Sequence, residues 1–101
     1  MNEINSAWMA GLFEGEGCIY KDPRYNSYRL SLNSTDLDVL QKLQTIAGCG
    51  SIRSKKSEHK PAWDWRIYKR ADVIRLLSAM LPHFGGRRAY KSLNALDDLE
   101  L

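Results

Sequence analysis

The sequence predicts an α+β fold, in which a four-stranded antiparallel sheet carries its helices on one face. Two observations lead to this fold class. The hydrophobic pattern runs helix, strand, strand, then repeats that order and ends in two further helices. In the clearest strand, apolar and polar side chains alternate, which is typical of a sheet with one buried and one polar face. We therefore expect an αββαββα core within a single domain, residues 1–101.

The first half of the chain should form a helix, a hairpin and a second helix. Asn5 or Ser6 is expected to cap the first helix, which ends where glycine recurs at residues 15–17. The alternation of apolar and polar residues is strongest in the second strand of the hairpin. The other expected elements are strands at 17–21 and 28–33, a turn at 22–27, and a helix over 37–46 after a capping sequence at 34–36.

The second half repeats this order. Strands are expected over residues 51–56 and 62–68, and in the latter Trp63 and Trp65 should face the core. The apolar spacing of residues 73–80 predicts a third helix. After the glycine break at 85–86 a last helix is expected, with an apolar face formed by Ala89, Leu93, Leu96 and Leu99.

Composition excludes several classes of protein. The hydrophobic fraction of 44% and the charged fraction of 27% are ordinary for a globular domain. No apolar run reaches the ~20 residues of a membrane span, and residues 1–10 do not have the pattern of a signal peptide. Cys18 and Cys49 are expected to be reduced, which favours an intracellular location, cytoplasmic or organellar.

Basic residues are concentrated in the middle and later part of the chain. Residues 50–91 contain 11 Lys and Arg against 3 Asp and Glu, whereas residues 1–49 contain 4 and 6. A basic segment is the electrostatic footprint of a protein that binds a polyanion. Many soluble domains have a basic half for solubility alone, so charge indicates a nucleic-acid partner only weakly.

The expected open face of the sheet is polar and basic. Strands can enter the major groove of DNA, where such side chains read base edges and contact phosphates. Taken alone, the face is better explained as an ordinary solvated surface, and its mixture of Arg, Ser, Asn and Asp shifts the balance slightly toward DNA. The candidate DNA contacts are Tyr20, Arg29, Ser31, Asn33, Arg53, Lys55, Asp64 and Arg66, with Arg88 and Lys91 as phosphate contacts from the last helix.

Small residues recur every four positions in the first helix. Ala7, Gly11 and Gly15 share one helix face, and glycine inside a helix costs about 1 kcal/mol per residue relative to alanine. Close packing of a second helix is one reason for such a face, because small residues let two backbones approach. Two paired helices of this kind would bring two copies of Glu16 together at the base of the sheet.

The segment from Met9 to Gly17, MAGLFEGEG, resembles the LAGLIDADG motif of homing endonucleases. It has the small pair Ala10-Gly11, the apolar pair that follows it, and an acid–small–acid–glycine ending at residues 14–17. The similarity continues over nearly the whole chain, through both strand pairs and the arginines after Gly86. The resemblance therefore implies the fold of this family.

The resemblance also implies an activity, hydrolysis of phosphodiester bonds in both strands of a long, near-palindromic DNA target. The cofactor would be Mg²⁺ or another divalent cation such as Mn²⁺, bound by Glu16 with help from the Gly15 carbonyl. Arg87, where the family commonly has lysine, would stabilise the transition state. Apart from the resemblance, Asp36 or Thr35 is a candidate to orient a water molecule at the start of the second helix, and the alternative is that Asp36 is only the N-cap of that helix. One motif per chain implies a homodimer, whose interface would contain Ala7, Ala10, Gly11, Glu14 and Gly15.

Two alternatives stay open. The first is a protein of this fold that has lost cleavage and binds DNA or RNA, as a splicing cofactor or regulator; the acid at Glu16 argues against it. The second is an interaction protein without a nucleic-acid partner, in which the glycine-rich helix serves only dimerisation. The basic segment of residues 50–91 argues against this second alternative.

Overall fold

The computed structural model describes residues 1–55 and 60–100. The four strands form one antiparallel sheet in the order β1-β2-β4-β3. The predicted α+β class and αββαββα order are therefore confirmed; Lys56, predicted to extend the third strand, lies outside the described residues. The elements are α1 (Glu3–Glu16), β1 (Gly17–Asp22), β2 (Ser27–Ser34), α2 (Leu37–Ala47), β3 (Ser51–Lys55), β4 (Ala62–Ile67), α3 (Arg70–Met80), a short 3-10 helix η1 (Leu81–His83) and α4 (Gly86–Glu100).

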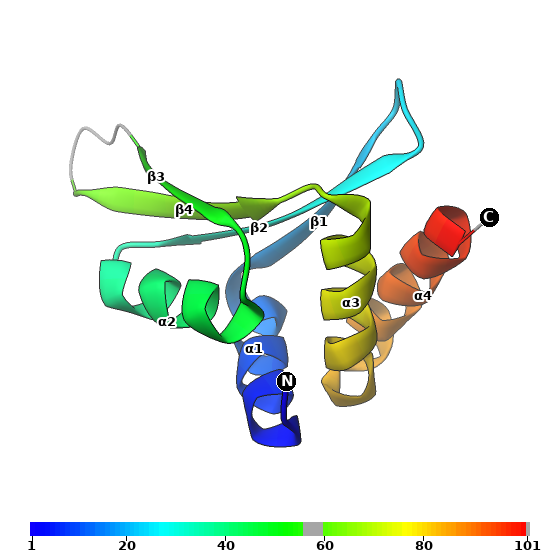
Figure 1. Ribbon diagram of the computed structural model, residues 1–101, viewed down its shortest axis with the longest axis horizontal. Coiled ribbons are helices and arrows are strands. Elements are labelled where there is room, and N and C mark those ends of the chain that lie inside the picture. Colours follow the sequence, from blue (N-terminus) through cyan, green and yellow to red (C-terminus); the bar gives the residue numbers. More distant parts are fainter. Residues whose placement is uncertain (56–59, 101) are drawn as a thin grey trace.

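The helices cover one face of the sheet. Figure 1 shows the sheet along the top of the molecule, with α1, α2, α3 and α4 beneath it and the β1–β2 hairpin rising at one end. Within residues 1–55 and 60–100 the upper face of the sheet carries no helix, and none of the helices is both long and apolar enough to cross a membrane. The upper face is therefore open.

The core forms between the sheet and the helices beneath it. Trp65 of β4 is fully buried and meets Phe13 of α1 edge to face, with ring centroids 5.9 Å apart. Its indole Nε1 donates to the Cys49 carbonyl at 3.1 Å, so the polar end of the ring is also satisfied. Burial alternates along β2, with Tyr28, Leu30 and Leu32 inward, as the sequence pattern predicts.

Two predictions about helix details were wrong. α1 begins earlier than expected because Asn2 is its N-cap, and the Asn2 Oδ1 accepts a 2.7 Å hydrogen bond from the Asn5 N–H. Asn5 and Ser6 therefore lie inside the helix, where Ser6 packs inward. In α4, Leu93 is 48% exposed because Ser92 takes the inward position and donates from Oγ to the Arg88 carbonyl at 2.8 Å.

Candidate metal site and nucleic-acid interface

The motif helix α1 delivers Glu16 to the edge of the sheet. Glu16 is the last helical residue, and Gly17 both caps the helix and starts β1; its N–H donates to the Phe13 carbonyl. A Cβ atom at position 17 would overlap the ring and backbone of Phe13, so only glycine allows this close turn from helix to strand. The exposed Glu16 carboxylate is thus placed by the tight packing behind it.

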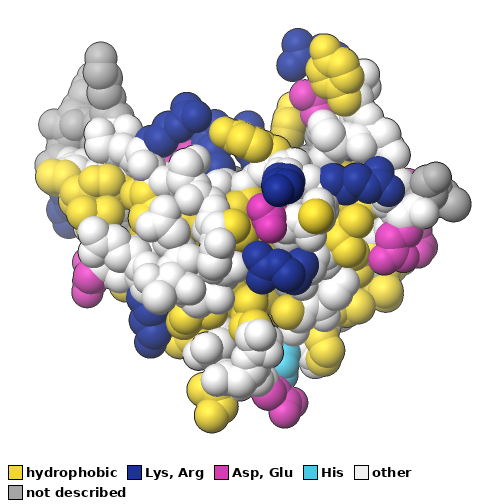
Figure 2. Space-filling view, in the orientation of Figure 1, with side chains coloured by type: hydrophobic (Ala, Val, Ile, Leu, Met, Phe, Trp, Pro, Cys, Tyr) yellow, Lys and Arg dark blue, Asp and Glu magenta, His cyan; other side chains and the backbone are white. Residues whose placement is uncertain are grey.

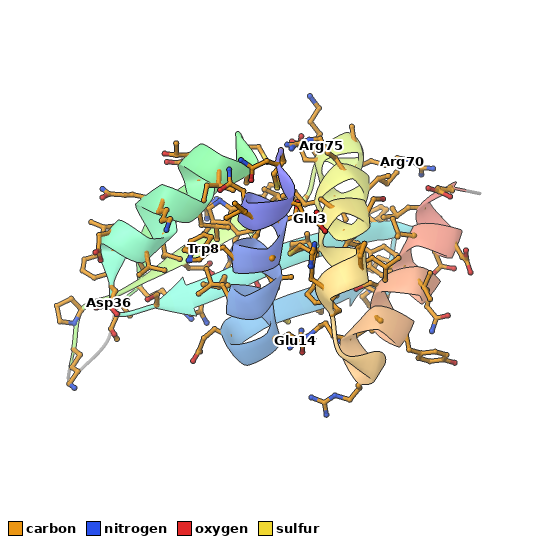
Figure 3. All side chains as sticks on the ribbon, turned by 90° about the horizontal axis from the view of Figure 1, so that it is seen from below. Glu3, Trp8, Glu14, Asp36, Arg70 and Arg75 are labelled. Carbon is orange, nitrogen blue, oxygen red and sulfur yellow. The ribbon has the colours of Figure 1, made fainter. Side chains whose placement is uncertain are left out.

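Glu16 and Asp36 line the same open hollow, with Asn33, Ser34 and Thr35. Asp36 stands at the N-cap position of α2, yet its carboxylate makes no capping hydrogen bond. Figure 3 shows Asp36 at the start of α2, at the end of the molecule away from α4. Two of the three predicted catalytic side chains therefore border one cavity, although they come from different elements.

The oxygen atoms at this hollow fit a hard divalent cation. Carboxylates such as those of Glu16 and Asp36 are preferred ligands of Mg²⁺, and the Gly15 carbonyl lies in the last helical turn, where carbonyls lack a partner within the helix. Among the described residues, however, no group of three or more His, Cys, Asp or Glu side chains could hold a metal ion. A cation at Glu16 would therefore need ligands beyond these described side chains, such as backbone carbonyls, water molecules or groups of a second chain.

The two arginines at the start of α4 have different surroundings. Arg88, whose contact to a phosphate stays a prediction, donates from Nη1 to the Gly17 carbonyl at 2.9 Å and from Nη2 to the Glu14 carbonyl at 3.4 Å. Arg87 and Lys91 are exposed and line a second hollow beside Gly17. Arg88 thus holds the end of α1, and Arg87 does not line the hollow of Glu16 and Asp36.

The predicted dimer residues divide into an open face and an inward part. Ala7, Gly11 and Gly15 are exposed, and a Cβ atom at either glycine would meet nothing within 4 Å. Ala10 is fully buried in the core of its own chain. The prediction of Ala10 as an interface residue was therefore wrong, because helical geometry turns it inward, next to Met9 and Phe13.

Glu14, also predicted at the interface, is tied within its own chain. Its Oε1 accepts a hydrogen bond from the Gly85 N–H. This contact joins α1 to the segment that precedes α4. Figure 3 shows Glu14 at the end of α1 that lies toward α3 and α4.

The open face of the sheet brings together the eight candidate DNA contacts from the strands. Cross-strand pairing places Tyr20 opposite Arg29, Ser31 opposite Arg66, and Asn33 opposite Asp64. The Arg29 guanidinium lies 4.7 Å from the centre of the Tyr20 ring, a cation–π contact. Figure 2 shows Lys and Arg side chains along the top of the molecule, on the side of the sheet away from the helices.

Asp64 differs from the other candidates on this face because only 3% of it is exposed. Its Oδ2 accepts from the Arg66 Nε, and its Oδ1 accepts from the Asn33 Nδ2 at 2.7 Å, with the amide oriented to satisfy both of its ends. The prediction that Asp64 contacts DNA is therefore corrected. Asp64 lies beneath its neighbours and its oxygens are already used.

A cluster that the sequence did not predict joins α4 to the β1–β2 hairpin. Asp98 binds the Tyr28 hydroxyl and the Lys21 Nζ, the latter at 3.0 Å, while the Asn26 Nδ2 donates to the Asp98 carbonyl at 3.0 Å. The pKa of Tyr28 is raised to about 12, mainly by burial and to a smaller extent by the hydrogen bond to Asp98. The hydrogen bonds from Tyr28 and Lys21 lower the pKa of Asp98. No spacing rule connects residues 70 positions apart, so the sequence carries no signal for this cluster.

The fold is shared with solved homing endonuclease structures. I-CvuI, in complex with its target in the presence of calcium, gives a TM-score of 0.75 at 19% identity over 97% of this chain and 67% of that chain. I-TnaI gives 0.75 at 20% identity over 94% and 71%. The group I intron-encoded I-CeuI, complexed with DNA, gives 0.75 at 18% identity over 99% and 56%.

Comparison at the level of sequence agrees with the fold. No curated protein sequence matches the chain. The family model of the LAGLIDADG endonucleases, in contrast, matches residues 9–92, which include the motif, all four strands and the first part of α4. The chain therefore belongs to the LAGLIDADG endonuclease family.

Proposed function

We propose that this protein is a site-specific DNA endonuclease that acts as a homodimer with a divalent metal ion. The observation that carries the proposal is the placement of Glu16. Its exposed carboxylate stands at the end of the motif helix and shares a hollow with the Asp36 carboxylate, and this hollow is also lined by Asn33 of the polar sheet face. Family membership and the DNA-bound I-CvuI and I-CeuI structures support the same function.

The chemistry of the hollow suits phosphodiester hydrolysis. Glu16 and the Gly15 carbonyl would hold Mg²⁺, or Mn²⁺ in its place, and a bound divalent cation supplies Lewis-acid polarisation of a phosphate oxygen. Asp36 would accept a hydrogen bond from a water molecule and orient it, since no capping bond engages its carboxylate. Arg87 would neutralise charge on a phosphate from the neighbouring hollow, as a permanently charged donor.

Pairing of two chains would add metal ligands to those that the described part of one chain supplies. The exposed stripe of Ala7, Gly11 and Gly15 lets two copies of α1 pack backbone to backbone. Such packing would bring the two Glu16 carboxylates together and add ligands to each metal ion. A twofold dimer would also match a near-palindromic double-stranded DNA target and cut both strands.

Cleavage of a plasmid library with random inserts, in the presence of Mg²⁺, tests this function. We expect the wild-type protein to cut specific inserts and Glu16→Gln to cut none, because the amide removes the negative charge that attracts the cation. Glu3→Gln is the matched control, since Glu3 is also exposed on α1 but lies at its opposite end. Cutting by Glu16→Gln would show that the active site lies elsewhere.

One observation favours a second candidate, a family member that binds DNA or RNA without cutting. The described part of a single chain lacks a cluster of three metal-binding side chains. Absence of cutting by wild-type protein, together with nucleic-acid binding that weakens with added salt, would support this candidate. Absence of both cutting and salt-sensitive binding would exclude both candidates.

A further inference from the structure

A buried carboxylate lies under the open face of the sheet. Asp64 stands on β4, between β2 and β3, and points to the polar face, yet it is 3% exposed. Removing a carboxylate from water is unfavourable unless partners replace the lost hydration. Here Asn33 and Arg66 supply them, one at each carboxylate oxygen. This arrangement fixes the side chains around Asp64 rather than exposing Asp64 itself.

The pairing with Asp64 determines how Arg66 meets solvent. A guanidinium group is planar and has one N–H at Nε and four at the two Nη atoms. Because the Nε–H donates to Asp64, the plane of the group is set and the Nη atoms lie at its outer end. The Arg66 side chain remains 33% exposed and borders a hollow with Ser51 and Tyr68. Arg66 therefore presents a fixed pair of parallel donors toward an open space.

The strands beside Arg66 leave room for a ligand to reach it. Cross-strand pairing places Ser31 of β2 on one side of Arg66 and Ser51 of β3 on the other. Both side chains are short, so the Arg66 guanidinium is not covered by its direct neighbours. This row begins at the first residue of β3 and crosses the two inner strands, β4 and β2. Base edges line the floor of a DNA groove, and a long side chain on an inner strand can reach them.

The network also extends away from Arg66. The Asn33 Oδ1 accepts from the Lys55 Nζ at 3.2 Å, so a continuous chain of hydrogen bonds runs Arg66–Asp64–Asn33–Lys55. Side chains held in this way lose less conformational freedom when a ligand binds, and their geometry discriminates more strongly between ligands. The central part of the open face is thus organised before DNA arrives.

We propose that the Asp64–Arg66 pair reads one guanine in each half of the DNA target, an inference that rests on the DNA-binding function proposed above. The two Arg66 Nη donors match the adjacent O6 and N7 acceptors of guanine in the major groove, whereas adenine places an amino donor beside its N7. Asp64 is the positioning residue: it touches no base and holds the guanidinium plane through Nε. Arg66 is the residue that contacts the base.

Binding profiles over DNA with randomised half-sites, measured without a divalent metal, test this pairing. In the wild-type profile we expect one position per half-site with a strong preference for guanine. Arg66→Lys should reduce that preference about 10-fold or more, because lysine keeps the charge but cannot donate two parallel bonds. Asp64→Asn should reduce the guanine preference at the same position, because the neutral amide binds the Arg66 Nε–H less strongly than the carboxylate does. If Asp64→Asn does not fold, Arg66→Lys still carries the test.

Arg70→Lys is the matched control. Arg70 is an exposed arginine at the start of α3, outside the candidate DNA contacts, and its replacement should leave the guanine preference at the Arg66 position unchanged. If Arg66→Lys weakens binding to all DNA sequences equally and lowers the salt dependence of binding, Arg66 contacts a phosphate. If the variant changes neither the affinity nor the preference, Arg66 contacts no DNA. Either result shows that the guanine assignment is wrong. If the wild-type protein binds no DNA, the proposed function itself fails.

Discussion

Arg88 of α4 donates a hydrogen bond of 2.9 Å to the carbonyl of Gly17, the residue at which the motif helix ends. A second bond reaches the Glu14 carbonyl. The positive charge also lies at the helix C-terminus, where the helix dipole favours it. The position of Glu16 between these two carbonyls therefore depends on a side chain from the last helix of the chain.

Replacement of Arg88 should therefore affect stability more than replacement of its neighbour. We expect Arg88→Ala to lower the free energy of unfolding by about 1–3 kcal/mol, because the partly buried Gly17 carbonyl loses its donor. Arg87→Ala, at an exposed site, should change it by no more than about 0.5 kcal/mol and reduce DNA cleavage instead. Urea denaturation measures the free energy of unfolding of both variants, and plasmid cleavage measures their activity. Equal losses of stability in the two variants would contradict the structural role of Arg88.

Alanine at the open glycines should separate stability from assembly. In Gly11→Ala and Gly15→Ala the new Cβ meets nothing within the chain, so we expect the monomer to gain up to about 1 kcal/mol from helix propensity. The same methyl groups should weaken the proposed dimer by holding the two helices apart. Sedimentation equilibrium gives the dimer dissociation constant, with Gly86→Ala, another open glycine, as the control. An unchanged dissociation constant would place the interface elsewhere.

The two glycines that follow α2 should respond differently to alanine. Gly48 has φ +72° and open space around it, whereas Gly50 has φ +103° and an added Cβ would overlap the Trp65 indole. We expect Gly48→Ala to cost about 1–2 kcal/mol from backbone strain. Gly50→Ala should cost more, by about 1–3 kcal/mol, because it also displaces a fully buried tryptophan. Thermal unfolding compares the two, and a smaller loss at position 50 would contradict the structure.

Asp36 should matter for cleavage rather than for the helix that it precedes. Its carboxylate makes no capping hydrogen bond, so Asp36→Asn should lower stability by less than the ~1 kcal/mol typical of a lost cap. It should reduce the cleavage rate, since the amide accepts a water proton more weakly. Asp38→Asn, at an exposed site in the first turn of the same helix, is the control and should cut normally.

The free energy of unfolding should fall at alkaline pH because the Tyr28 hydroxyl loses its proton. Its pKa is raised from 10.0 to about 12 by burial and by its hydrogen bond to Asp98, so the unfolded chain loses this proton first. The contribution of the protonated Tyr28 to the free energy of unfolding is complete below pH 10 and is lost as the pH rises toward 12. We expect Tyr28→Phe to show a shallower fall over this range in urea unfolding than wild type. Tyr90→Phe, at an exposed site, should keep the steeper fall.

Much of the fold could be predicted because local patterns report local geometry. The alternation along residues 28–33 identified a strand and both of its faces, and glycine after Glu16 marked the end of the motif helix. The wrong cap shows the limit of such patterns. Asn2, Asn5 and Ser6 all have capping side chains; in the structure Asn2 caps the helix, while Ser6 is buried one turn inside it.

The sequence by itself determined the order of the elements, the open face of the sheet and the acid at the end of α1. Only the tertiary structure decided which groups come together: Glu16 shares a hollow with Asp36, Arg88 binds the Gly17 carbonyl, and Asp64 lies beneath Arg66. The physical reason is that periodicity is set by the backbone of one segment. Burial and pairing of polar groups depend instead on contacts between segments that are far apart along the chain.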